Sequence, residues 1–182
     1  MSYFICDVES DDPYMPEYSI VCFAAIVVEP SMSKIFYGKM KPISENWNPN
    51  ALAISGFSRE EHLTFNEPEK VMKKFAEWLK INSKGSPIGI SDNNGYDFGV
   101  CLNYYFHRFY GSNPFGWSSR RIGDLFCGAE ANMWYRWKNI EILQNIPIII
   151  IQFQMLFLMQ VLYFIYPKHI ILDYFNLYRL KK

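Results

Sequence analysis

Three apolar segments separated by short connections occupy the first 40 residues, and they are the strongest constraint on the fold. They span residues 3–6, 18–29 and 34–40 and are rich in the β-branched and aromatic residues that favour strands. Residues 30–33 form a connection of hairpin length, so the second and third segments are predicted to pair antiparallel. The first segment must then lie beside one of them, and the chain begins with a β-sheet.

Two helices and two further strands are predicted downstream. Residues 66–80 place apolar side chains at helical spacing, and Asn66 begins a capping-box pattern. A short strand at 88–90 leads through a polar loop into a helix from about Asp97, and residues 121–126 are expected to form a fifth strand. This order predicts an α/β fold with a mixed five-stranded sheet flanked by helices.

Composition narrows the class of protein. A chain of 182 residues has the size of one domain, and 50% hydrophobic with 18% aromatic residues excludes a disordered chain. The formal net charge of zero gives no global attraction to nucleic acid, so such binding needs a local patch or a metal. The four cysteines never form a Cys-x-x-Cys pair and are expected to be reduced, with three of them buried. No signal-peptide pattern opens the sequence, and a cytoplasmic location is expected.

An acidic pair ends the first predicted strand. Asp7 and Glu9 are two residues apart, so on a strand their side chains point to the same face. Like charges resist such convergence unless a cation lies between them, and Mg²⁺ or Mn²⁺ prefers oxygen ligands. Asp97 begins a helix behind a short strand and a polar loop, at a sheet edge where α/β proteins place their sites. Asp92, in the loop before it, is a competing candidate for the functional acid. The alternative, that these residues are ordinary acids at a strand end or a helix cap, stays open.

Several segments together resemble a known family. Residues 4–9, Phe-Ile-Cys-Asp-Val-Glu, resemble the first motif of the DEDD 3′–5′ exonucleases, which have an RNase H-like fold and include RNase T and the proofreading subunit of bacterial replicative polymerase. Residues 51–58 look like the family's linker, and residues 94–98, Asn-Gly-Tyr-Asp-Phe, are similar to its second motif. Residues 120–125 resemble the strand before the third motif, so the resemblance covers about residues 3–137.

The resemblance implies a catalytic metal centre. Asp7, Glu9 and Asp97 would be ligands of two Mg²⁺ or Mn²⁺ ions that activate water and stabilise the leaving 3′-oxygen. Aromatic rings next to such a centre can stack on terminal bases of any sequence. On this basis, nucleic-acid contacts are expected at Gly56, Phe57 and Tyr96, whereas Phe98 is expected in the core.

The third motif of the family is a helix that carries a general-base histidine and an aspartate five residues later. His169 and Asp173 are the catalytic candidates for these two roles, but they are four residues apart and stand among bulky apolar residues. The alternative is a terminal helix with incidental polar residues. His62 and His107 precede the place of this motif and are expected on the surface or in helices.

The composition changes at position 138. Residues 1–137, the exonuclease-like domain, carry a net charge of −3, whereas residues 138–182 carry +3 and include 10 isoleucines. Residues 146–166 are 21 residues without a charge, a length sufficient to cross a bilayer, but Pro147 and three glutamines interrupt them. Three interpretations of this hydrophobic tail remain open, in order of preference: a frame-shifted segment, a buried helix and a membrane segment. Translating the gene in all three frames beyond codon 137 distinguishes the first from the others.

The predicted function is a metal-dependent 3′–5′ exonuclease that acts on single-stranded DNA or RNA ends, with activity impaired because the third motif is not intact. DNA and RNA stay undistinguished, since contacts to the 2′-hydroxyl cannot be read from the sequence. A non-catalytic nucleic-acid-binding module on the same fold and a membrane-tethered interaction protein are the alternatives. The chain is also expected to be able to form a homodimer. Association with a membrane is a further, less favoured, expectation.

Overall fold

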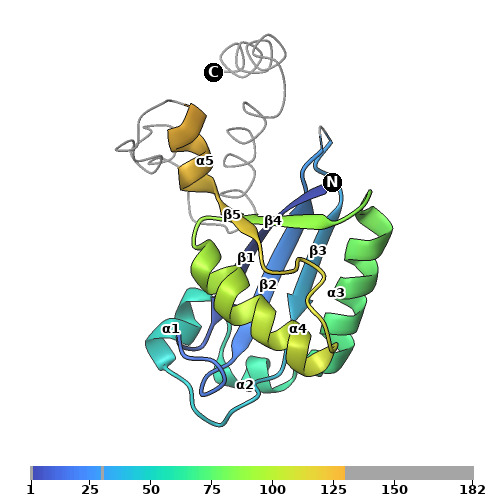
Figure 1. Ribbon diagram of the computed structural model, residues 1–182. Coiled ribbons are helices and arrows are strands. Elements are labelled where there is room, and N and C mark those ends of the chain that lie inside the picture. Colours follow the sequence, from blue (N-terminus) through green and yellow to red (C-terminus); the bar gives the residue numbers. More distant parts are fainter. Residues whose placement is uncertain (1, 30, 130–182) are drawn as a thin grey trace, which may run out of the picture. The chain divides into compact units, whose positions relative to one another are not determined.

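The computed structural model describes residues 2–29 and 31–129 (Figure 1). The chain divides into two units, Met1–Arg120 and Arg121–Lys182, and the sheet with its candidate site lies almost entirely in the first. The predicted tail of residues 138–182, including His169 and Asp173, falls outside the described residues, so the boundary at 138 stays a prediction. Within the described residues, no helix is long and apolar enough to cross a membrane.

The centre of the fold is a five-stranded mixed sheet with the strand order β3-β2-β1-β4-β5. Its strands are β1 (Ser2–Ser10), β2 (Ile20–Val27), β3 (Ile35–Lys39), β4 (Pro87–Ser91) and β5 (Ser119–Arg121). The antiparallel hairpin of β2 and β3 is confirmed, and β1 pairs antiparallel with β2 and parallel with β4. The mixed α/β sheet expected from the order of apolar segments is therefore present.

The helical segments are α1 (Pro49–Ile54), α2 (Arg59–Leu63), α3 (Pro68–Asn82), the π-helix η1 (Gly95–Leu102), α4 (Asn103–Phe109) and α5 (Ile122–Ala129). The two short helices α1 and α2 occupy the segment that resembles a linker. Each begins at a side-chain cap, because Asn48 accepts a hydrogen bond from the Asn50 amide and Ser58 forms a reciprocal capping box with Glu61. These caps supply partners for amides that so short a helix leaves unpaired.

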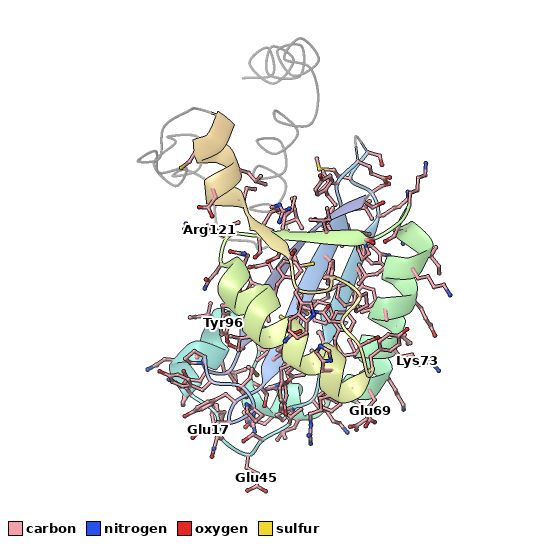
Figure 2. All side chains as sticks on the ribbon, viewed as in Figure 1. Glu17, Glu45, Glu69, Lys73, Tyr96 and Arg121 are labelled. Carbon is pink, nitrogen blue, oxygen red and sulfur yellow. The ribbon has the colours of Figure 1, made fainter. Side chains whose placement is uncertain are left out.

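Helices α3 and α4 pack together over one face of the sheet (Figure 1). Along α3, the charged residues Glu69 and Lys73 point outward (Figure 2), and the opposite stripe is buried. The Phe23 ring packs directly over Gly38, where an added Cβ would be 2.6 Å from a ring atom. The centre of this core is a group of contacting aromatic side chains: Phe4, Phe23, Phe36, Phe75, Trp78, Phe106 and Phe115.

The predicted capping box at the start of α3 is wrong. The helix begins at Pro68, and its N-cap residue Glu67 makes no side-chain capping bond. Asn66 instead forms an isolated bridge with Met40, and its carbonyl accepts a 2.8 Å hydrogen bond from the Lys41 amide. Proline suits the first helical position because its missing N–H would have no helical partner there.

The fifth strand predicted over residues 121–126 is also wrong for most of its length. β5 ends at Arg121, and α5 begins at Ile122. A short apolar run fits either structure, and Ile122, Leu125 and Phe126 recur at the i, i+3, i+4 spacing of a helix.

Candidate active site

Asp7 and Glu9 lie on the part of β1 that extends beyond β4. The parallel pairing with β4 runs only as far as Ile5 opposite Ile90, whereas β2 accompanies β1 to Ser10. The two carboxylates are therefore on a stretch of strand that has a neighbouring strand on one side only. Both side chains are half-buried.

The alternation along β1 separates the carboxylates from the core. Phe4, Cys6 and Val8 belong to the cluster covered by α3 and α4. Because successive side chains of a strand point to opposite faces, Asp7 and Glu9 point to the other face of the sheet. The expectation that they share one face is met.

Asp97 lies at the same edge of the sheet, in the helix η1 that follows β4. Since β1 and β4 are parallel, both strands end at this edge, and η1 begins directly after the turn that follows β4. Asp97 is the third residue of η1, is 3% exposed, and donates its amide to the Asn93 carbonyl at 2.9 Å. The helix expected from about Asp97 is thus present, but it starts two residues earlier and is π-helical, a form often found at functional sites.

Burial and mutual repulsion raise the pKa of all three carboxyl groups. Burial, then the charge of Asp7 and more weakly that of Asp92, raises the pKa of Asp97 to about 8. The pKa of Glu9 rises to about 7 through burial and then Asp7. Burial and then the charge of Asp92 raise the pKa of Asp7. Asp92, the competing acid of the loop, therefore lies within electrostatic range of the group.

The donor chemistry of these residues suits a hard divalent cation. In the described part of the chain, no lysine, arginine or histidine forms an ion pair with Asp7, Glu9 or Asp97. Crowded carboxylates without a cationic partner are the ligand set that Mg²⁺ or Mn²⁺ takes. No group of three or more Asp, Glu, His or Cys side chains among the described residues is already closed around one ion position.

Tyr96 links the two elements that carry the carboxylates. Its hydroxyl lies 2.5 Å from Ser10 Oγ at the end of β1 and donates a longer bond, 3.4 Å, to the Asp12 carbonyl. Figure 2 shows Tyr96 at the start of the helix formed by η1 and α4. Burial raises the pKa of this hydroxyl. The residue predicted to stack on bases thus also fastens η1 to β1.

Gly56 and Phe57 lie at the turn between α1 and α2. Gly56 is exposed and has a φ of 77°, a left-handed conformation that favours glycine. Phe57 is half-buried and packs edge-on against Phe65, with ring centroids 5.0 Å apart. The Lys39 ammonium lies over both rings, 5.3 Å from the Phe57 centroid and 5.0 Å from that of Phe65.

A buried ionic cluster follows β1 and was not expected from the sequence. The fully buried carboxylate of Asp11 accepts hydrogen bonds from the Ser19 amide at 2.5 Å and from Arg59 Nη1 at 3.1 Å, and its Oδ2 lies 3.8 Å from His62 Nδ1. Burial and then the Arg59 charge lower the pKa of His62 to about 4. His62 is in a helix as expected, but it is buried, whereas His107 on α4 is exposed. No local pattern indicates the cluster, because Asp11 and His62 are distant in sequence.

Two smaller expectations are confirmed. Cys6, Cys22 and Cys101 are buried free thiols. Phe98 is 5% exposed and belongs to the core cluster, where its ring fills the space beside Gly89.

The comparison with known proteins decides the family. The 3′-5′ DNA exonuclease Cap18 of Escherichia coli is 33% identical over 140 residues, which cover 75% of this chain and 73% of that protein. The chain belongs to the DEDD 3′–5′ exonucleases. No protein-family model matches the sequence.

Solved structures of exonuclease I share the fold of this DEDD member. The zinc-bound complex of the Escherichia coli enzyme with single-stranded DNA has a TM-score of 0.57 at 18% identity and matches 71% of this chain. A metal-free form of the same complex gives 0.57 at 16% identity over 70% of this chain, and a product-bound exonuclease I gives 0.58 at 18% over 77%. This chain spans about a third of the exonuclease I chain, 30%, 30% and 34% respectively.

Proposed function

We propose that this protein is a metal-dependent exonuclease that removes nucleotides from the 3′ ends of single-stranded DNA, with Asp7, Glu9 and Asp97 as metal ligands. The observation that carries the proposal is the parallel pairing of β1 with β4, which delivers Asp97 to the edge where β1 presents its two carboxylates. The relative Cap18 is named as a 3′–5′ DNA exonuclease, and exonuclease I was solved with single-stranded DNA. Both support DNA over RNA.

The residues of the chain have distinct roles in the proposed reaction. Bound Mg²⁺ or Mn²⁺ supplies Lewis acidity, an activated water and charge stabilisation for the leaving oxygen. Asp7 and Glu9 hold the ions on one face of β1, and Asp97 closes the site from η1. Because Asp97 is buried, its carboxylate interacts through a medium of lower dielectric than water, which strengthens its hold on a cation.

Gly56, Phe57 and Tyr96 stay the proposed contacts to the terminal nucleotides. An exposed turn with an adjacent half-buried ring suits stacking on a base, which needs only an aromatic face. For Tyr96, the hydroxyl bond to Ser10 leaves the ring as the part that could touch a base.

His169 and Asp173 remain predictions for the general base and the fourth carboxylate. Proton transfer by a positioned base contributes about 10² to 10⁴-fold to a rate. A His169→Ala variant that cleaves as fast as the unchanged protein would remove His169 from the mechanism. A loss on that scale would assign it the role.

The experiment is a cleavage assay on a 5′-labelled single strand with Mg²⁺, with Mn²⁺ and with a chelator. We expect a ladder that shortens from the 3′ end only when a metal is present and that forms about 10² to 10³-fold more slowly in Asp7→Asn. Cleavage that resists the chelator, or that is as fast in Asp7→Asn as in the unchanged protein, contradicts the proposed metal ligands. Binding of the strand without turnover under any metal points instead to a non-catalytic nucleic-acid-binding module.

A further inference from the structure

The strand pairing places Lys39 and Tyr37 on the face that carries the carboxylates. Glu9 is opposite Cys22, which is opposite Lys39, and residues directly opposite in a sheet project to the same face. Two strand spacings separate Lys39 from Glu9, or about 10 Å between backbones. In the same way, Tyr37 is in register with Asp7 across β2.

Electrostatic effects agree with this register. Burial raises the pKa of Cys22, the charges of Glu9 and Asp7 raise it further, and the charge of Lys39 lowers it, so the cation and the acids act on one thiol. The Glu9 charge also contributes to the raised pKa of Tyr37. Lys39 is half-buried and Tyr37 is 49% exposed.

Lys39 differs from the two neighbouring lysines. Lys34 pairs with Glu29 at 2.8 Å, and Lys41 pairs with Glu67 at 2.7 Å. In the part of the chain that the structure describes, Lys39 has no carboxylate partner, and its ammonium lies over the two phenyl rings of Phe57 and Phe65. A cation held by ring faces keeps its full charge, so it remains able to pair with an anion.

We propose that Lys39, held over Phe57 and Phe65, binds a backbone phosphate of the nucleic-acid strand upstream of the scissile bond. Because the backbones of Lys39 and Glu9 are about 10 Å apart, Lys39 suits a phosphate other than the one at the carboxylates. The same phenyl pair offers a ring edge or face to the adjacent base, which combines a phosphate contact with a stacking surface. This inference rests on the proposed function, because it assumes a single strand whose 3′ end lies at the carboxylates.

The arrangement also explains how a chain without net positive charge can bind a polyanion. Asp7, Glu9 and Asp97 repel a phosphate until a metal is bound. Lys39 supplies a fixed positive charge on the same face, and it does so without depending on the metal. Strand binding should therefore have a component that persists when the metal is removed.

The test measures binding of fluorescein-labelled oligodeoxythymidylate by anisotropy in a chelator, over a range of salt concentrations, so that cleavage does not interfere. Lys39→Gln removes the charge, Lys39→Arg keeps it, and Lys34→Gln is the matched control that removes a lysine paired elsewhere on the chain. We expect Lys39→Gln to weaken binding about 3 to 10-fold and to reduce the slope of log affinity against log salt by about 0.7, the value for one phosphate contact on a single strand. Lys39→Arg and Lys34→Gln should match the unchanged protein.

An unchanged affinity and salt slope in Lys39→Gln overturns the proposal, as does an affinity loss without a change in slope, which would mark a purely structural lysine. Failure of the unchanged protein to bind the oligonucleotide overturns it too. A thermal melt of each variant separates loss of contact from loss of fold. A cleavage assay of the unchanged protein and of Asp7→Asn keeps the two hypotheses apart. If neither cleaves DNA but the slope of log affinity against log salt still falls in Lys39→Gln, the exonuclease proposal fails and the phosphate contact stands.

Discussion

Strand β1 has two halves with opposite surroundings. Residues 2–5 run beside β4, and Phe4 and Ile5 are also paired with β2 and almost completely buried. Beyond Ile5 the strand pairs with β2 alone and carries half-buried acids whose pKa values are raised by burial and repulsion. In the first half, both faces of the strand are buried. In the second half, Cys6 and Val8 still enter the core, but the acids on the other face repel one another, and this repulsion opposes folding.

The largest effect on stability is expected in the first half. Phe4 is fully buried and contacts the rings of Trp78 and Phe115, so Phe4→Ala should lower the free energy of unfolding by about 3 to 5 kcal/mol. Chemical denaturation monitored by circular dichroism measures it. Ile81→Ala is the control, since Ile81 is 82% exposed and its loss should cost little. A mild effect at Phe4 would break the division between the halves.

The second half should show the reverse pattern. Asp7→Asn is expected to reduce cleavage by about 10² to 10³-fold, the scale of losing one group that stabilises transition-state charge. In the absence of metal it should leave the fold as stable as before or more stable, because it removes a charge that raises the pKa of Asp97 and Glu9. Nuclease rates and denaturation curves are compared with those of Glu17→Gln, an exposed acid. A strongly destabilised Asp7→Asn would contradict this reading.

The buried cluster of Asp11, Arg59 and His62, which begins directly after β1, predicts a pH effect on the stability of the fold. His62 has a pKa of about 4 in the folded protein against an ordinary value of 6.5, so the unfolded chain takes up a proton at this histidine first as the pH falls. The contribution of neutral His62 to the free energy of unfolding is therefore complete above pH 6.5 and is lost between pH 6.5 and 4. Burial raises the pKa of Asp11 to about 6, which acts in the opposite direction over part of this window, and the Arg59 charge faces both groups.

The His62 contribution can be isolated by difference. Between pH 6.5 and 4, the unchanged protein should lose about 1 to 2 kcal/mol more unfolding free energy than His62→Gln does. His107→Gln, at an exposed histidine, should leave the pH dependence unchanged. Parallel pH profiles for all three proteins would show that the cluster does not contribute as described.

The smallest expected effect concerns the link between β1 and η1. Tyr96→Phe removes the hydroxyl that bonds to Ser10 and should cost about 1 kcal/mol of unfolding free energy. A double-mutant cycle with Ser10→Ala tests the pair, and the two changes should be less than additive. Tyr14→Phe is the control at a 70% exposed tyrosine. Strict additivity would show that the two hydroxyls do not act together.

Much of the fold could be predicted because its signals are local. The apolar runs and the hairpin-length connection indicate β2 and β3, and the apolar stripe indicates α3. The short helices α1 and α2 were missed although the Ser58–Glu61 capping box was in the sequence, since five or six residues are too few for a periodic stripe. At Asn66 the same pattern predicts a helix start that the structure does not have, because the backbone of Asn66 forms a bridge with Met40.

The candidate site was predictable only in part for a related reason. Asp7 and Glu9 are recognisable from spacing on one strand, and Asp97 from its place after another. The cluster of Asp11, Arg59 and His62 depends on contacts between residues nearly 50 positions apart, as between Arg59 and Asp11, which no local pattern encodes. Lys39 was missed because its position relative to Glu9 follows from the register of three strands rather than from any motif.

The π-helical form of η1 fixes an angular relation between Asp97 and the rest of its helix. A residue in an α-helix turns the chain by about 100°, and a π-helix turns it less. In this form η1 contacts β1 and the charge of Asp7 acts on Asp97, while Leu102, Tyr105 and Phe106 of the same helical run enter the core. Removing one exposed residue, such as Gly99, would convert the segment to α-helical phase and rotate Asp97 relative to α4. The length of this segment, as much as the identity of its acid, therefore determines whether β1 and η1 present their carboxylates together.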